Sequence, residues 1–223
     1  MQTHLAESVV EVARVRELFP WARHYTEVYD RFGLLGGRSL FAHCIHLAEE
    51  ERVRLAATGS VAVLCPTSNF FLGSGLVEVG ALAHPARPVR CALGTDVGGG
   101  TSWSMLRTAA ALHDLARLRG HPWGVVDAFR LITAGNAEAL GLGDRIGRLE
   151  PGFEADLVVL EPRASCAMAH RLGEDPGLEE ELAVLLWLAD ERAVWRVYLA
   201  GEPMAGTEIA GARHPAAGVR GGG

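Results

Sequence analysis

The chain alternates short apolar segments with amphipathic ones, and this alternation restricts its fold more than any other feature. "SLFAHC", "SVAVLCP" and "VRCALGTD" are short apolar runs that end in polar or turn-forming residues. Segments with helical spacing follow two of them, "LAEEERVRLAATG" and "SMLRTAAALHDLARLRG", the first with Gly59 placed as a C-terminal cap. Strands that alternate with helices predict parallel βα units, so we expect an α/β fold.

The two ends of the chain add further elements. In "ESVVEVARVRELF", residues 7–19, the apolar side chains share one helical face and Pro20 follows, which predicts an amphipathic helix. After residue 120, "PWGVVDAFRLITAGNAEALG" predicts helix, a Pro-Gly turn precedes a strand over Asp156–Leu160, "LEEELAVLLWLAD" predicts a helix and "AVWRVYLAG" a strand. The tail "GARHPAAGVRGGG" lacks periodicity, and we expect it to be disordered.

Composition excludes several classes of partner. The 223 residues include 27 acidic and 21 basic ones, for a net charge of -6, and no Lys/Arg-rich run is present, which argues against binding to nucleic acid. No apolar run reaches the roughly 18 residues of a membrane span, and residues 1–20 lack the pattern of a signal peptide. We therefore expect a cytoplasmic protein with a small-molecule partner and no contact with membranes.

The cysteines and histidines limit the kind of metal site. No two cysteines form a C-x-x-C pair, so neither a zinc ribbon nor a redox motif is supported. An enzyme of the cytosol that uses zinc catalytically usually binds it through histidine and carboxylate, so these side chains are the ones to follow. The four cysteines are Cys44, Cys65, Cys91 and Cys166.

Three side chains suited to metal chemistry stand where predicted strands end. His43 closes one apolar run, Asp96 follows another, and His4 stands at the end of the short segment that opens the chain. Parallel strands in a βα barrel point their carboxyl ends at one face, and catalytic groups gather there. We therefore expect these three residues to converge. Glu7 belongs to the same group if it serves as a proton carrier, although a carboxylate in the first turn of a helix is equally expected for its effect on the helix dipole.

Several stretches resemble the guanine deaminases of the amidohydrolase superfamily. They are "QTHLAES", "YTEVYDRFGLL", "SLFAHCIHLAEEE", "CPTSNFFLGSGL", "ALGTDVGGGTSWSML" and "LGDRIGRLEPGFEADLVVL". Together they cover residues 1 to 160 almost without a gap. "CPTSNFFLGSGL" and "GTDVGGGTSWSML" are specific to these enzymes rather than to the wider superfamily.

The resemblance implies a particular fold. It implies the C-terminal half of a (β/α)8 TIM-like barrel with part of a small flanking β domain. Residues 1–135 would be a partial barrel with strands five to eight, residues 136–205 a C-terminal helix with flanking β-domain strands, and residues 206–223 the disordered tail.

The same resemblance implies roles for the strand-end residues. His4 would be a zinc ligand, Glu7 the proton shuttle and His43 the residue that orients the attacking water, whereas Asp96 would touch both metal and nucleophile. His4, Glu7 and Asp96 would also contact the purine. The implied reaction uses one zinc ion and converts guanine and water to xanthine and ammonia, a step of purine catabolism. Residues 66–69 and the "FFLGSG" that follows would shape the pocket, with no single residue assigned a role.

One departure from the family is large. The family opens its barrel with an H-x-H pair that supplies two zinc ligands, and no H-x-H occurs in this chain. We therefore expect an incomplete fragment that forms homo-oligomers or associates with a missing N-terminal half. Two alternatives stay open: a related amidohydrolase acting on another amino-heterocycle, such as a triazine or an adenosylhomocysteine-like nucleoside, and a half-barrel without catalysis.

Overall fold

The computed structural model describes residues 1–204, which form two compact units divided between Phe153 and Glu154. The tail of residues 206–223, expected to be disordered, lies outside the described residues. The elements of the first unit are β1 (Gln2–Leu5), α1 (Val9–Leu18), α2 (Tyr25–Arg31), β2 (Leu40–His43), α3 (Glu49–Thr58), β3 (Val61–Leu64), α4 (Pro66–Leu72), α5 (Val79–Leu82), β4 (Arg90–Leu93), α6 (Met105–Leu118), α7 (Val125–Arg130), η1 (Leu131–Gly135) and α8 (Asn136–Leu140).

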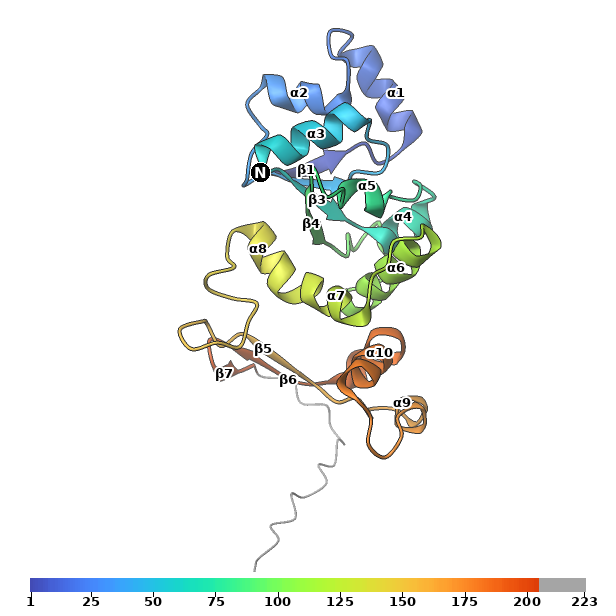
Figure 1. The fold of residues 1–223 in the computed structure, drawn as a ribbon, viewed down its shortest axis with the longest axis vertical. Helices are drawn as coiled ribbons and strands as arrows, with labels where there is room; N and C mark the ends of the chain where they lie inside the picture. Colours follow the sequence, from blue (N-terminus) through green and yellow to red (C-terminus); the bar gives the residue numbers. More distant parts are fainter. Residues whose placement is uncertain (205–223) are drawn as a thin grey trace, which may run out of the picture. The chain divides into compact units, whose positions relative to one another are not determined.

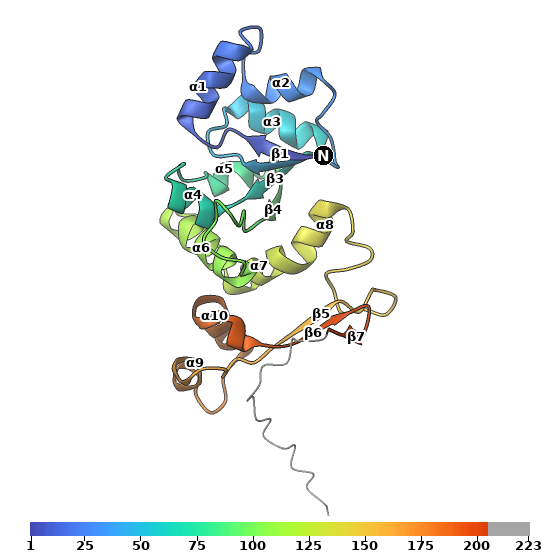
Figure 2. The ribbon, with the colours of Figure 1, turned by 180° about the vertical axis from the view of Figure 1, so that it is seen from behind.

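The first unit is built on one parallel sheet. Its strands lie in the order β1-β2-β3-β4, and each pairs in parallel with the next. In both views the sheet lies between α1, α2 and α3 on one side and α6, α7 and α8 on the other (Figures 1 and 2). The four parallel strands with intervening helices confirm the α/β fold and are half of the eight that a closed barrel requires.

Aliphatic and aromatic side chains from the strands form the core. Leu5, Phe41 and Leu64 come from β1, β2 and β3 and are at most 1% exposed. Helices contribute residues such as Leu55 and Leu112, which are fully buried. Each such side chain adds about 1.5–3 kcal/mol of hydrophobic stabilisation, so the sheet is held rigidly enough to position what its strand ends carry.

The first two predicted helices differ in their burial. Helix α3 ends where Gly59 takes the left-handed conformation, with φ of 68°, and this confirms the predicted cap. Helix α1 begins at a capping box in which Ser8 and Glu11 bond each other's backbone, but none of its residues is buried. The helix expected over residues 7–19 is therefore present, but only part of its apolar face is covered: Val12 and Val15 are half-buried, whereas Val9, Val10 and Leu18 are exposed.

The predicted helical segment after residue 120 is interrupted by one π-helical turn. The turn η1 connects α7 to α8, and its Thr133 hydroxyl donates to the carbonyl oxygen of Phe129 in α7. Helix α8 then packs against β4, where the Arg90 guanidinium donates to the carbonyl oxygen of Glu138. Helix α8 thus packs against the sheet, and the compact unit that contains it extends to Phe153.

Each outer strand of the sheet has one open side, and a side chain covers part of it. Because Gly94 donates to the Leu64 carbonyl oxygen, its neighbour Leu93 directs its own N–H and C=O away from β3. The Asn136 amide binds both of these groups, at 2.8 and 3.0 Å. On β1, the hydroxyl of Tyr29 donates to the carbonyl oxygen of His4 at 2.9 Å. Both of these side-chain hydrogen bonds lie close to the carboxyl ends of the strands.

The second unit holds a small antiparallel sheet. Its strands lie in the order β5-β6-β7, and β5 covers nearly the whole of the strand expected over Asp156–Leu160. The helix and strand predicted after it are present as α10 and β6, whereas the short helix α9 was not predicted. The elements are β5 (Leu157–Leu160), α9 (Cys166–Arg171), α10 (Leu178–Leu188), η2 (Glu191–Ala193), β6 (Val194–Leu199) and β7 (Glu202–Pro203).

None of the helices in residues 1–204 has both the length and the apolar character needed to cross a membrane.

The open sides of β1 and β4 predict self-association. Gln2 and Cys91 direct backbone groups to these sides, and no described residue bonds them there. Unpaired strand edges are templates for pairing with another chain. We expect light scattering to show dimers or larger species as concentration rises. Replacement Gln2→Pro, which removes an outward N–H at the start of an edge strand, should reduce association.

The control for this experiment is Arg107→Ala, which changes an exposed residue on α6 that belongs to neither edge strand. A wild-type chain that stays monomeric over the whole concentration range would contradict the prediction.

Candidate active site

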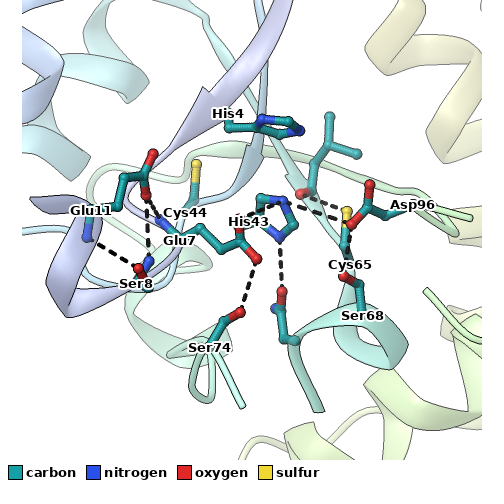
Figure 3. Close-up of polar contacts among 12 residues, drawn as sticks. His4, Glu7, Ser8, Glu11, His43, Cys44, Cys65, Ser68, Ser74 and Asp96 are labelled. Atoms are coloured by element: carbon teal, nitrogen blue, oxygen red, sulfur yellow. Dashed lines mark hydrogen bonds and ion pairs between the residues drawn. The ribbon is translucent and has the colours of Figure 1, made fainter. Parts of the chain in front are cut away.

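The four residues singled out at strand ends lie together at the carboxyl edge of the parallel sheet. His4 lies in β1, His43 closes β2, Asp96 follows β4 and Glu7 follows β1 (Figure 3). The ligand atoms of His4, His43 and Asp96 lie within 4.8 Å of one another. The two imidazole rings stand 5.2 Å apart between centroids, at an angle of 46°. The structure therefore brings the predicted residues together, while their roles stay predictions.

His43 occupies the centre of this group. Its side chain is 1% exposed, and its Nδ1 lies 2.8 Å from Oδ1 of Asn69. Its other ring nitrogen, Nε2, lies 3.6 Å from Oε2 of Glu7 and 3.9 Å from Oδ2 of Asp96. One edge of the ring is thus held by the protein, and the other faces two carboxylates.

Hydroxyl groups hold the two carboxylates. The Ser74 hydroxyl donates to Oε1 of Glu7 at 2.9 Å, and the Ser68 hydroxyl donates to Oδ2 of Asp96 at 2.7 Å. The N–H of Glu7 itself donates to the Glu11 carboxylate at 2.7 Å. Glu7 is thus bound at backbone and side chain, and its Oε2 is the oxygen that faces His43.

The backbone at these strand ends adopts an unusual conformation. Ala6, His43, Cys44 and Asp96 have φ of 51°, 71°, 52° and 50°, in the left-handed region that non-glycine residues rarely enter. Each such residue costs on the order of 1–3 kcal/mol, and such residues cluster at functional sites. Left-handed residues therefore occur at or just beyond the ends of three of the four strands, where the candidate residues lie.

Three residues that contact the candidates were not singled out from the sequence. Ser68 and Asn69 belong to α4, and Ser74 follows it. All three lie in "CPTSNFFLGSGL", which follows β3, so the end of that strand contributes to the site through them. Their position after a strand was a usable signal, but Ser and Asn are common in loops and are not usual zinc ligands, so spacing alone did not assign them a role.

His46 does not join the group. Its Nε2 lies 2.9 Å from the carbonyl oxygen of Ser74, which engages the ring with the backbone. The second histidine of "HCIH" therefore supports the turn that carries Ser74, and it does not add a third histidine to His4 and His43.

Two buried thiols at these strand ends do not ionise readily. Burial, together with the charge of Asp96, raises the pKa of Cys65 to about 12. Burial also raises the pKa of Cys44 well above its usual range. Both thiols stay protonated at neutral pH, so histidine and carboxylate are the better ligands in this site.

The raised pKa values predict selective alkylation. The thiolate is the nucleophile, so at about pH 8 iodoacetamide should modify exposed Cys166 rapidly and leave Cys44 and Cys65 intact. Intact mass spectrometry with and without denaturant measures this. Rapid modification of Cys65 in the folded chain would show that the strand end opens in solution.

The ligand set fits zinc only in part. Two imidazoles and a carboxylate are ligand types that zinc accepts, and tetrahedral ligands at about 2.0–2.1 Å from an ion stand roughly 3.4 Å apart. The separation of up to 4.8 Å therefore requires only a small movement, which His4, an exposed residue, can make. No other group of three potential ligands occurs within residues 1–204. If His43 contacts the attacking water and not the ion, only His4 and Asp96 remain as ligands. A usual catalytic zinc site has three protein ligands.

Comparison with known proteins places the chain in a family. The family model for the amidohydrolase family matches residues 1–203. This chain belongs to the amidohydrolase family. Guanine deaminase of Escherichia coli is 40% identical over 201 residues, which are 90% of this chain and 45% of that protein. The chain thus spans less than half the length of the curated relatives it matches first.

Solved structures of amidohydrolases agree with this placement. The E. coli guanine deaminase structure superposes with a TM-score of 0.88, covering 91% of this chain and 46% of that chain. A guanine deaminase from C. acetobutylicum with bound guanine in the active site is 29% identical, with a TM-score of 0.81, over 91% and 48%. An adenosine deaminase from Xanthomonas campestris with bound zinc is also 29% identical, with a TM-score of 0.78, over 91% and 44%. The half-barrel expectation is confirmed by these matches.

The incomplete ligand set predicts weak zinc binding by this chain. We expect a chelator competition assay to show zinc bound through His4 and Asp96. His4→Ala should weaken binding by more than about tenfold, since loss of even an outer-shell partner costs 10–100-fold. His170→Ala, which removes an exposed histidine of the second unit, is the matched control. Tight binding at one ion per chain that survives His4→Ala would contradict this ligand assignment.

Proposed function

We propose that this chain is the C-terminal part of a zinc-dependent deaminase that converts guanine and water to xanthine and ammonia in the cytoplasm. The observation that carries the proposal is the meeting of His4, Glu7, His43 and Asp96 at one edge of the sheet. The 40% identity to the E. coli enzyme and the similarity to a guanine-bound structure support guanine as the substrate.

His4 and Asp96 would hold the zinc ion. Zinc supplies a nucleophile at neutral pH, because it lowers the pKa of the water that it binds. The histidine nitrogen and the carboxylate oxygen are hard or borderline donors, which this ion accepts. Ser68 donates to Oδ2 of Asp96 and so fixes the orientation of this carboxylate.

Glu7 would carry protons. A ring nitrogen of the purine must gain a proton as the ring loses aromaticity, and the departing amino group must gain another. Oε1 of Glu7 is occupied by the Ser74 hydroxyl, which leaves Oε2 to face the space near His43. A carboxyl group held in this way can give a proton at one step and take one at another without moving far.

His43 would orient the attacking water. Its ring is buried and held at Nδ1, so Nε2 has a fixed direction. Because Nε2 faces both Glu7 and Asp96, a water between these groups would lie within reach of all three. Positioning of this kind lowers the entropic part of the barrier.

A second amino-purine is supported by one comparison. The zinc-bound adenosine deaminase is as identical to this chain, at 29%, as the guanine-bound deaminase of C. acetobutylicum. Adenosine and guanine should therefore both be tested as substrates. The solved triazine hydrolases are about 20% identical and show the shared fold alone.

The proposal predicts that this chain alone releases no ammonia at an enzymatic rate, because it offers two zinc ligands and less than half the length of its relatives. A chimera with the missing N-terminal part of the E. coli enzyme joined before Met1 should deaminate guanine, followed by absorbance and ammonia release. In this chimera Glu7→Gln should lower kcat by roughly 10²–10⁴-fold, the contribution typical of general acid-base catalysis.

The control is Glu17→Gln, which changes an exposed carboxylate that pairs with Arg14 on α1. A folded, zinc-loaded chimera that is inactive on guanine but active on adenosine would favour the second substrate. Inactivity on both would favour a non-catalytic half-barrel. Full activity of Glu7→Gln would remove Glu7 from the mechanism.

A further inference from the structure

One segment supplies a hydrogen bond to each of three candidate residues that lie on other strand ends. The segment is α4 with the turn that follows it, and it leaves the end of β3. The contacts connect residues that are 26, 28 and 67 positions apart in the chain. The pairs are Asn69 with His43, Ser68 with Asp96, and Ser74 with Glu7.

The contact of Asn69 with His43 is the most buried of the three. Both side chains are 1% exposed, and Oδ1 of Asn69 lies 2.8 Å from Nδ1 of His43. An amide oxygen can only accept a hydrogen bond. In this arrangement Nδ1 must therefore carry a proton, whether the ring is neutral or charged.

The other half of the amide has no such partner. Nδ2 of Asn69 is buried and makes no hydrogen bond within the described part of the chain. A buried donor left unpaired costs about 1–3 kcal/mol. Stability alone therefore does not account for an amide at this position, whereas the acceptor that it presents to His43 does.

We propose that Asn69 is a positioning residue that keeps the proton of His43 on Nδ1 and so leaves Nε2 as the ring nitrogen that faces the reaction space. The histidine's part in the reaction rests on the proposed function, but its proton position can be measured without zinc or a purine. Ser68 and Ser74 likewise hold the carboxylates of Asp96 and Glu7 in place by donating hydrogen bonds to them.

The position of this proton decides what His43 can do. With the proton on Nδ1, Nε2 carries a lone pair and can accept a hydrogen bond or a proton from water. With the proton on Nε2, the ring would donate toward Glu7 or Asp96, which lie 3.6 and 3.9 Å away, and could not accept from water. The amide at position 69 thus selects between two different functions of one side chain.

The test is long-range proton-nitrogen correlation NMR on the metal-free chain labelled with 15N-histidine, at an alkaline pH where the ring is neutral. The His43 signals are identified by their loss in His43→Gln. We expect the wild-type ring to carry its proton on Nδ1. Asn69→Leu should shift the population toward the Nε2–H form, which neutral histidine prefers in water, whereas Asn69→Asp, which keeps an acceptor, should preserve the Nδ1–H form.

Asn136→Leu is the matched control, because it removes the other asparagine of the chain, whose amide makes two hydrogen bonds to Leu93. It should lower the melting temperature without moving the His43 proton. A wild-type His43 with its proton on Nε2, or an Asn69→Leu variant with the wild-type spectrum, would overturn the inference. If Asn69→Leu does not fold, the spectra of the wild type and of Asn69→Asp decide it.

The result is independent of the proposed reaction. An inactive chimera whose His43 carries the Nδ1 proton would remove the deaminase assignment and leave this inference intact. An active chimera whose His43 carries the proton on Nε2 would support the deaminase assignment and overturn this inference.

Discussion

The parallel pairing of four short strands is the constraint on which the first unit depends. Because β1 to β4 run in one direction and each pairs with the next, their carboxyl ends meet along a single edge. Residues as distant in sequence as His4 and Asp96 become neighbours for this reason. An antiparallel arrangement of the same segments would have placed them at opposite ends of the sheet.

The gathering of charged and polar groups at this edge is unfavourable in itself. Two carboxylates lie within 4 Å of one buried imidazole, and several of the strand-end residues that surround it have left-handed backbone conformations. Hydrogen bonds donated by Ser68 and Ser74 to the carboxylate oxygens offset part of this. The hydrophobic core beneath the edge holds the strands in place against the remaining strain.

The strand-end candidates could be predicted from the sequence because their positions follow from periodicity. His43 and Asp96 stand at the boundary between an apolar run and a turn, His4 lies in the short strand that opens the chain, and the common direction of parallel strands brings the three together. Ser68, Asn69 and Ser74 could not be found in this way, since their function depends on which distant atom each one meets. Their residue types are ordinary for a loop.

Other parts of the fold also show that local features can be predicted from the sequence, whereas contacts with distant elements cannot. The cap at Gly59 is a local feature, and a single residue type with a left-handed backbone was enough to predict it. The exposure of α1 was missed because a periodic pattern defines an apolar face without naming what covers it. The π-helical turn at η1, which contacts β4 and α6, was also missed.

The Asn136 amide on β4 has a consequence for any strand that would extend the sheet at this side. It occupies both outward backbone groups of Leu93, so the ladder of hydrogen bonds is already complete at the last residue of the strand. An incoming strand can form its ladder only with residues nearer the start of β4, such as Cys91, unless it displaces the amide. The side chain therefore acts as a register stop, which fixes how far along β4 a neighbouring strand can slide.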